Sequence, residues 1–107
     1  MDEPVWASYT QACLNNADVL RDVAVVMAGA STALVHESGR QLVANFDRPV
    51  MFVWCAEDRT FPVSHAYRYA AELRQATVVL VEDSFSFTPE DNPAALASAI
   101  SELVRAG

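Results

Sequence analysis

The sequence predicts an α/β fold with two parallel strands, and it predicts part of such a domain rather than a whole one. Two short apolar runs, Val50–Cys55 and Val78–Val81, have the composition of strands that are buried on both faces. The segment between them has helical spacing and is long enough to connect parallel strands. Because only two such runs occur in 107 residues, both outer edges of the predicted sheet would be unpaired.

Composition and charge exclude several classes of protein. A hydrophobic fraction of 52% excludes a disordered chain. The net charge of −7 argues against nucleic acid as a partner. No apolar stretch approaches the ~18 residues of a membrane span, the acidic N-terminus does not resemble a signal peptide, and the two cysteines form no metal or disulfide pattern. We expect a cytoplasmic protein with no membrane association, metal or cofactor.

The N-terminal residues predict helices. Residues 5–14 are weakly amphipathic. Asn16 can cap a second helix, because apolar residues follow it at nearly helical spacing. Gly29 would end this helix. A further helix is expected over Thr32–Ala44, weakened by the glycine in its middle.

Residues 46–105 predict the order strand, helix, strand, helix. After Val50–Cys55, apolar side chains recur at helical spacing from Ala66 to Leu73, and Val78–Val81 follows. Asn92 and Pro93 then mark a helix start, because a capping side chain is followed by a first-turn proline. The buried stripe of that last helix is expected to comprise Leu96, Ile100, Leu103 and Val104.

Acidic residues follow both predicted strands, at the sheet edge where open parallel sheets bind ligands. Asp58 follows the first strand and could orient a histidine, or it could be a solvated or helix-capping carboxylate. Glu57 and Asp58 form one acidic pair, and Glu82 and Asp83 form another. Hard cations bind such oxygen clusters, although loop acids at this edge are more often solvated or cap the next helix.

Three other features are not expected to carry chemistry. His36 lies in the middle of a predicted helix and His65 in the first turn of another, where surface roles are usual. The segment Gly29–Ala33 imitates the G-x-S-x-G nucleophile elbow, with alanine at the last place. That elbow requires a strand before the serine, and the pattern here is helical, so we interpret the segment as a turn between helices.

The order of motifs after Phe46 resembles the late portion of the α/β-hydrolase family. Residues 46–62, FDRPVMFVWCAEDRTFP, show a proline, an apolar strand and a short turn into an acidic residue. A helix, a second strand at 78–81, a loop over 83–91 and the Asn92–Pro93 helix start follow in the family's order. The resemblance covers residues 46–105. Residues 5–45 resemble the family's helical cap much more loosely.

The resemblance implies that Asp58 is the acid of a Ser-His-Asp triad, which would hold the histidine tautomer and stabilise the imidazolium. Counted back from Pro93, the family's histidine falls at Ser86, and a serine hydroxyl cannot act as the base near neutral pH. The family's nucleophile elbow and oxyanion hole precede the cap and have no counterpart in this sequence.

Two functions follow as hypotheses. In the first, residues 1–107 are a single partial domain, the C-terminal portion of an α/β-hydrolase-like protein. Its parent would hydrolyse ester-type or related bonds of a small-molecule substrate, and this chain would be inactive without the missing N-terminal half. In the second, the chain is a non-enzymatic interaction module that pairs with itself or another partner through its open sheet edge.

Overall fold

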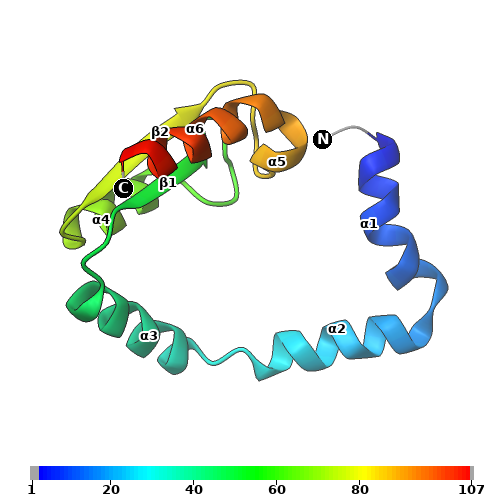
Figure 1. Ribbon diagram of the computed structural model, residues 1–107. Helices are drawn as coiled ribbons and strands as arrows, with labels where there is room; N and C mark the ends of the chain where they lie inside the picture. Colours follow the sequence, from blue (N-terminus) through cyan, green and yellow to red (C-terminus); the bar gives the residue numbers. More distant parts are fainter. Residues whose placement is uncertain (1–2, 107) are drawn as a thin grey trace. The chain divides into compact units, whose positions relative to one another are not determined.

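The computed structural model describes residues 3–106 (Figure 1). Contacts divide the chain into two compact units, of which one ends at Gly39 and the other begins at Arg40. The first unit is helical, and the second holds the sheet and the predicted functional edge.

Three helices cover the N-terminal part: α1 (Glu3–Asn15), α2 (Ala17–Gly29) and α3 (Thr32–Asn45), of which α3 extends into the second unit. None of these helices buries a residue. The predicted cap of α2 is confirmed, because the Asn16 side chain accepts hydrogen bonds from the Asp18 amide at 2.9 Å and the Val19 amide at 3.4 Å. These bonds satisfy amides that have no partner within the helix.

The segment between α2 and α3 is a turn, as the sequence predicts. The Ala30 amide donates to the Met27 carbonyl at 3.4 Å, and the Ser31 hydroxyl oxygen accepts the Leu34 amide at 3.3 Å. Ser31 therefore caps α3 and does not occupy a nucleophile elbow, which would follow a strand.

Among residues 3–106, no single helix has both the length and the hydropathy to cross a membrane. The helices α2 and α3 reach those values only when they are taken together, as a bent pair.

The predicted parallel strands are confirmed. Strand β1 (Val50–Cys55) has the predicted bounds, and β2 (Ala76–Val81) begins at Ala76 rather than at Val78. The strands pair in parallel, from Val50 opposite Ala76 to Cys55 opposite Val81. Within the described residues the sheet has only these two strands, so no strand pairs with the outer edge of either one.

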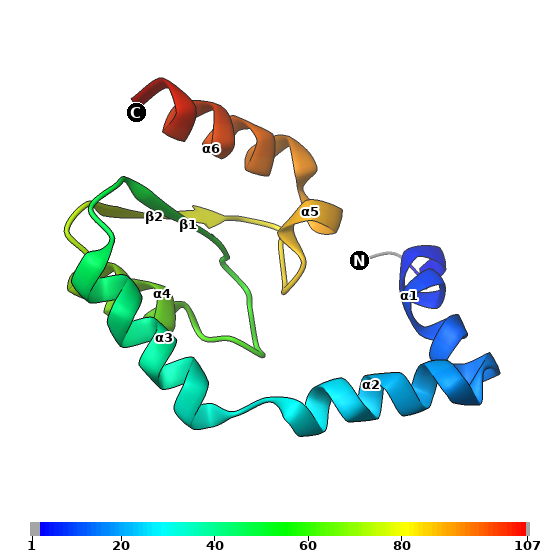
Figure 2. The same cartoon turned by 60° about the horizontal axis from the view of Figure 1, so that its bottom comes forward.

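Helices cover both faces of this small sheet, as Figure 2 shows for α4 (Val63–Glu72) and α6 (Pro93–Ala106). Ala66 on α4 and Leu73 just after the helix are buried, and both are predicted apolar positions. Phe52 and Tyr69 also meet across this interface, edge to face, with ring centroids 5.8 Å apart. Because period-two alternation places Phe52 on the α4 face, the neighbouring Val53 lies on the α6 face.

The start of α6 is as predicted, and its buried stripe agrees in part, because Leu96 and Leu103 are half-buried. The Asn92 side chain accepts the Ala95 amide at 3.2 Å, which caps the helix before Pro93. Ala99 is the buried residue of α6, whereas Ile100 is 52% exposed and Val104 is 74% exposed. Ala99 is therefore buried with Leu96 and Leu103 half-buried, and Ile100 and Val104 remain exposed.

The one-turn helix α5 (Thr88–Asp91) is not predicted by the sequence, which indicates a loop there. Four residues are too few to show helical periodicity. The turn buries Thr88 and brings it beneath the carboxyl end of β1.

Candidate functional site

The carboxyl ends of β1 and β2 open at one sheet edge, and backbone hydrogen bonds join the segments that follow them. The Ala56 amide donates to the Val81 carbonyl at 2.9 Å, and the Glu57 amide to the Ser84 carbonyl at 3.2 Å. The Ser84 amide in turn donates to the Glu57 carboxylate at 3.2 Å. These bonds hold the turn after β1 against the loop after β2.

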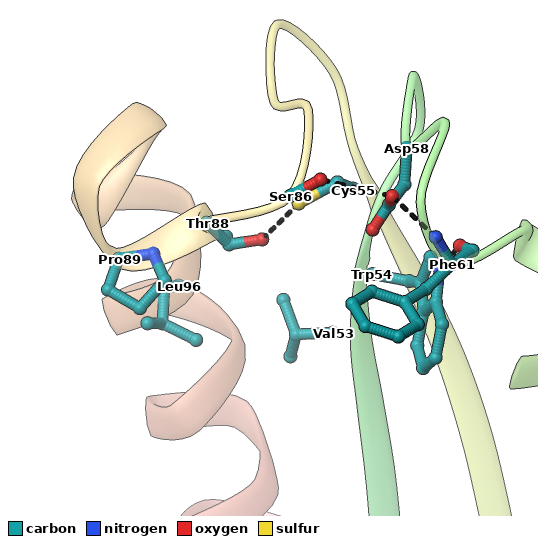
Figure 3. Close-up of a pocket in the computed structure, with 9 residues that line it drawn as sticks. All are labelled: Val53, Trp54, Cys55, Asp58, Phe61, Ser86, Thr88, Pro89 and Leu96. Carbon is teal, nitrogen blue, oxygen red and sulfur yellow. Dashed lines mark hydrogen bonds between the residues drawn. The ribbon is translucent and has the colours of Figure 1, made fainter. Parts of the chain in front are cut away.

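Asp58 and Ser86 meet at this edge (Figure 3). The Ser86 hydroxyl donates to Asp58 Oδ1 at 3.1 Å. The same oxygen accepts the amides of Thr60 and Phe61, each at 2.8 Å. Asp58 thus shapes its own turn and also reaches the loop after the neighbouring strand.

The surroundings of Asp58 keep it ionised. Partial burial of the carboxylate raises its pKa, but the hydrogen bonds from the Phe61 and Thr60 amides and from the Ser86 hydroxyl together outweigh that effect. The pKa of Asp58 therefore lies below its usual value, because hydrogen bonds to the charged form favour ionisation. A carboxylate in this state can accept an N–H or O–H donor, but it is a poor general acid or base near neutral pH.

The loop that carries Ser86 is tightly turned. Asp83 has a φ of 53°, a left-handed conformation that aspartate tolerates better than most residues. The Phe85 amide donates to the Asp91 carboxylate at 3.0 Å, which ties the loop to α5. Ser86 Oγ also lies 2.7 Å from the Phe85 carbonyl, so its single proton is shared between that carbonyl and Asp58.

A cavity of about 310 Å³ lies below Asp58 and Ser86. Trp54 Nε1 donates to the Phe61 carbonyl at 2.8 Å, which fixes the loop beside the cavity. The wall of the cavity is mixed, with two aromatic rings, aliphatic groups, a carboxylate, hydroxyls and a thiol. Figure 3 shows the residues that line it: Val53, Trp54, Cys55, Asp58, Phe61, Ser86, Thr88, Pro89 and Leu96.

A buried polar cluster lies beside this cavity, and the sequence does not reveal it. The apolar run predicts a purely apolar environment for Cys55, but its thiol lies 2.8 Å from Ser84 Oγ and 2.9 Å from Thr88 Oγ1. Ser84 Oγ also donates to Thr88 Oγ1 at 3.3 Å. All three residues are buried, so the hydroxyls satisfy one another and the thiol without water.

Within the second unit, His65 is not among the described residues that line the Asp58 cavity. His65 lies on α4 and lines a different cavity, together with Phe52 and Tyr69. His36 belongs to the first unit and is exposed on α3. Among the described residues, those that line the Asp58 cavity include hydroxyls and a thiol but no imidazole.

A cation site at the acidic pairs also finds no support. Across residues 3–106, no group of three or more His, Cys, Asp and Glu side chains is arranged to hold a metal ion. Glu57 binds the Ser84 amide, and Asp58 binds two amides and a hydroxyl. These carboxylates therefore hold the loops through hydrogen bonds, a role that differs from the solvated or helix-capping one expected as the alternative to a cation site.

Comparison of this chain with protein-family models, with curated proteins and with solved structures finds no match. What the residues and their geometry support is an α/β arrangement in which a carboxylate and a hydroxyl meet at the carboxyl edge of two parallel strands.

Proposed function

We propose that residues 46–105 are the C-terminal, acid-bearing portion of an α/β-hydrolase-like domain. The contact between Asp58 and Ser86 carries this proposal. Asp58 follows one strand and Ser86 follows its parallel neighbour, with 3.1 Å between their oxygens. In a hydrolase triad the acid and the histidine occupy these two places, because the acid must reach the imidazole Nδ1.

The open sheet also supports this proposal. Among the described residues neither strand has a second neighbour, and large apolar side chains such as Phe61, Phe85 and Leu80 are at least 40% exposed. Strands of a parallel sheet are normally interior elements, covered on both faces and paired on both sides. A parent protein would supply the missing strands, the nucleophile and the oxyanion donors for hydrolysis of an ester-type or related bond.

The chain itself would have no hydrolase activity. Nucleophilic hydrolysis needs an activated nucleophile, a base within hydrogen-bond reach and donors to the oxyanion. Asp58 offers only the orienting acid. We expect purified chain to hydrolyse p-nitrophenyl acetate at the background rate, with no difference between wild type and Asp58→Asn. A clear rate that disappears in Asp58→Asn would overturn this proposal and direct attention to an unrecognised nucleophile, beginning with Ser31.

A designed histidine tests the role of Asp58 directly. We expect the imidazole introduced by Ser86→His to titrate above the ordinary histidine pKa of ~6.5, because the nearby carboxylate favours the imidazolium. The measurement is an NMR titration in a His36→Gln, His65→Gln background, which leaves one imidazole in the chain. Adding Asp58→Asn is the matched control and should return that pKa to its ordinary value. A pKa that is insensitive to Asp58→Asn would contradict the triad-like layout.

A second candidate function is a non-enzymatic interaction module. The observation that favours it is the unpaired outer edge of β1, a strand whose side chains are apolar throughout. Such an edge presents unpaired N–H and C=O groups, and those groups recruit another strand.

A further inference from the structure

The hydrogen bonds of the sheet define which groups of β1 face outward. The Val50 amide donates to the Gln75 carbonyl at 2.8 Å, and the Ala56 amide to the Val81 carbonyl at 2.9 Å. Alternate residues of a strand direct their backbone groups to opposite edges. Met51, Val53 and Cys55 therefore direct their N–H and C=O groups away from β2, toward the edge that no described strand covers.

We propose that a second copy of this chain pairs with that edge, β1 against β1, antiparallel and about a two-fold axis at Val53. The proposal rests on the second candidate function, the interaction module, and names its partner. A two-fold axis makes the contact self-complementary, so that the assembly closes as a dimer instead of extending into a fibre. The product would be a four-stranded sheet with β2 on both outer edges.

The backbone selects this register. Val53 lies opposite the partner's Val53 and Met51 opposite the partner's Cys55, so that each outward-facing residue meets another and exchanges two hydrogen bonds with it. The Cys55 carbonyl also accepts the Asp58 amide, but at 3.4 Å, and a carbonyl has a second lone pair.

Neighbouring registers are worse. A shift of two residues in one direction brings Cys55 opposite Pro49, which has no N–H to donate. A shift in the other direction brings Met51 opposite Glu57, whose amide already donates to the Ser84 carbonyl at 3.2 Å. The Val53 axis is therefore the register that uses all of the outward-facing groups.

Side chains on the α4 face support the same register. Phe52 comes opposite the partner's Trp54, at a position where the strands approach most closely and aromatic pairs add stability. Both side chains are only partly buried within one chain, and both line an apolar cavity of about 370 Å³ beside His65 and Tyr69. The dimer would contain this aromatic pair twice and would cover the strand side of the cavity.

Charges that flank the strand are complementary in this arrangement. β1 is preceded by Asp47 and Arg48, and Arg48 is 82% exposed. It is followed by Glu57, Asp58 and Arg59. Antiparallel pairing about Val53 brings the end of the strand with Asp47 and Arg48 toward the partner's end with Glu57, Asp58 and Arg59, whereas parallel pairing would bring like ends together. This local attraction counteracts the repulsion between two chains that each carry −7.

Proline substitutions at the two sheet edges test the proposal. We expect sedimentation equilibrium to give the dimer mass for wild type and the monomer mass for Val53→Pro, which removes an outward N–H and leaves the ladder to β2 intact. Val78→Pro is the matched control, because Val78 faces the outer edge of β2, and it should retain the dimer mass. Far-ultraviolet circular dichroism checks that each variant is folded.

Cysteine cross-linking tests the register without proline. In a Cys13→Ser, Cys55→Ser background, Val53→Cys should form a disulfide-linked dimer on mild oxidation, since paired Cα atoms ~5.5 Å apart suit a disulfide. Met51→Cys is the control. Its two copies would be four residues out of register, more than ~13 Å apart along the strands, and should not cross-link.

Each result decides between defined alternatives. A wild-type chain that is monomeric at every concentration would overturn self-pairing, while the interaction-module function could still be met by a different partner. Loss of the dimer in Val78→Pro but not in Val53→Pro would assign the contact to β2, and cross-linking through position 51 would overturn the register. The hydrolase proposal is decided separately by the imidazole titration.

Discussion

Asp58 combines a local structural role with a long-range contact of the candidate site. Its Oδ1 accepts hydrogen bonds from the amides of Thr60 and Phe61, and such bonds are common in a turn that follows a strand. The same oxygen accepts a hydrogen bond from the Ser86 hydroxyl, 28 residues away in the sequence. The local bonds explain why an aspartate suits this position even without catalysis. Only the contact with Ser86 distinguishes a triad-like arrangement from an ordinary turn.

The depressed pKa of Asp58 predicts how acid acts on the fold. A carboxyl whose pKa is lower in the folded chain than in the unfolded chain adds stability above its unfolded pKa, and that stability is lost as the pH falls through the folded value. We expect Asp58→Ala to lower the free energy of unfolding by about 1 kcal/mol at neutral pH, because the exposed hydrogen bonds are modest. The difference from wild type should shrink below pH ~4. Urea unfolding of both proteins from neutral pH to below pH ~4 measures this difference in the free energy of unfolding. A difference that grows in acid would contradict the lowered pKa of Asp58.

Sequence reasoning identified Asp58 and Ser86 but missed the polar partners of Cys55. Position after a strand singled out Asp58, whereas Ser86 followed only from the resemblance to the α/β-hydrolase family, counted back from Pro93. Ser84 and Thr88 lie 29 and 33 residues from Cys55. No local pattern reports such a contact, and an apolar run gives no sign that its last side chain meets hydroxyls.

At the scale of elements, sequence patterns located strands and caps more reliably than the buried face of a helix. The bounds of β1 follow from a continuous apolar run between polar residues, and the start of α6 follows from Asn92 and Pro93. Two of the four residues expected in the buried stripe of α6, Ile100 and Val104, are exposed, because size was taken as a sign of burial. Ala99 is buried, and Ile100 beside it is exposed.

The face of α6 can be tested with two substitutions at adjacent positions. Ala99 is only 3% exposed, so Ala99→Leu should overpack the contact with the sheet and lower the free energy of unfolding by about 1–3 kcal/mol. Ile100→Ala removes a side chain that is 52% exposed and should change the free energy of unfolding by less than about 0.5 kcal/mol. Chemical denaturation of the two variants gives the comparison. Equal losses, or a larger loss for Ile100→Ala, would restore the stripe that the sequence predicted.

At the scale of the whole molecule, the two units differ in what holds them together. Buried apolar residues occur on β1, α4, β2 and α6 and on the residue just after α4, and they are Cys55, Ala66, Leu73, Val81 and Ala99. Helices α1, α2 and α3 bury none. Local signals such as the Asn16 cap define where those helices begin, but capping is a small contribution compared with the burial of an apolar face.

This difference predicts unequal amide protection along the chain. Helices of 13 or 14 residues are marginal in water when no apolar face is buried, so the amides of α1 and α2 should exchange with solvent much faster than those of β1 and β2. Hydrogen–deuterium exchange followed by mass spectrometry measures this directly.

Trypsin provides an independent readout, because Arg21 and Arg40 lie in the helical part and should be cleaved before Arg68 in α4. Protection of α2 equal to that of β2 would mean that its exposed apolar face, which includes Val23, Val26 and Met27, is covered in solution. Hydrogen–deuterium exchange of Val53→Pro would then show whether self-association through β1 covers this apolar face. If it does, loss of the dimer should make the amides of α2 exchange faster.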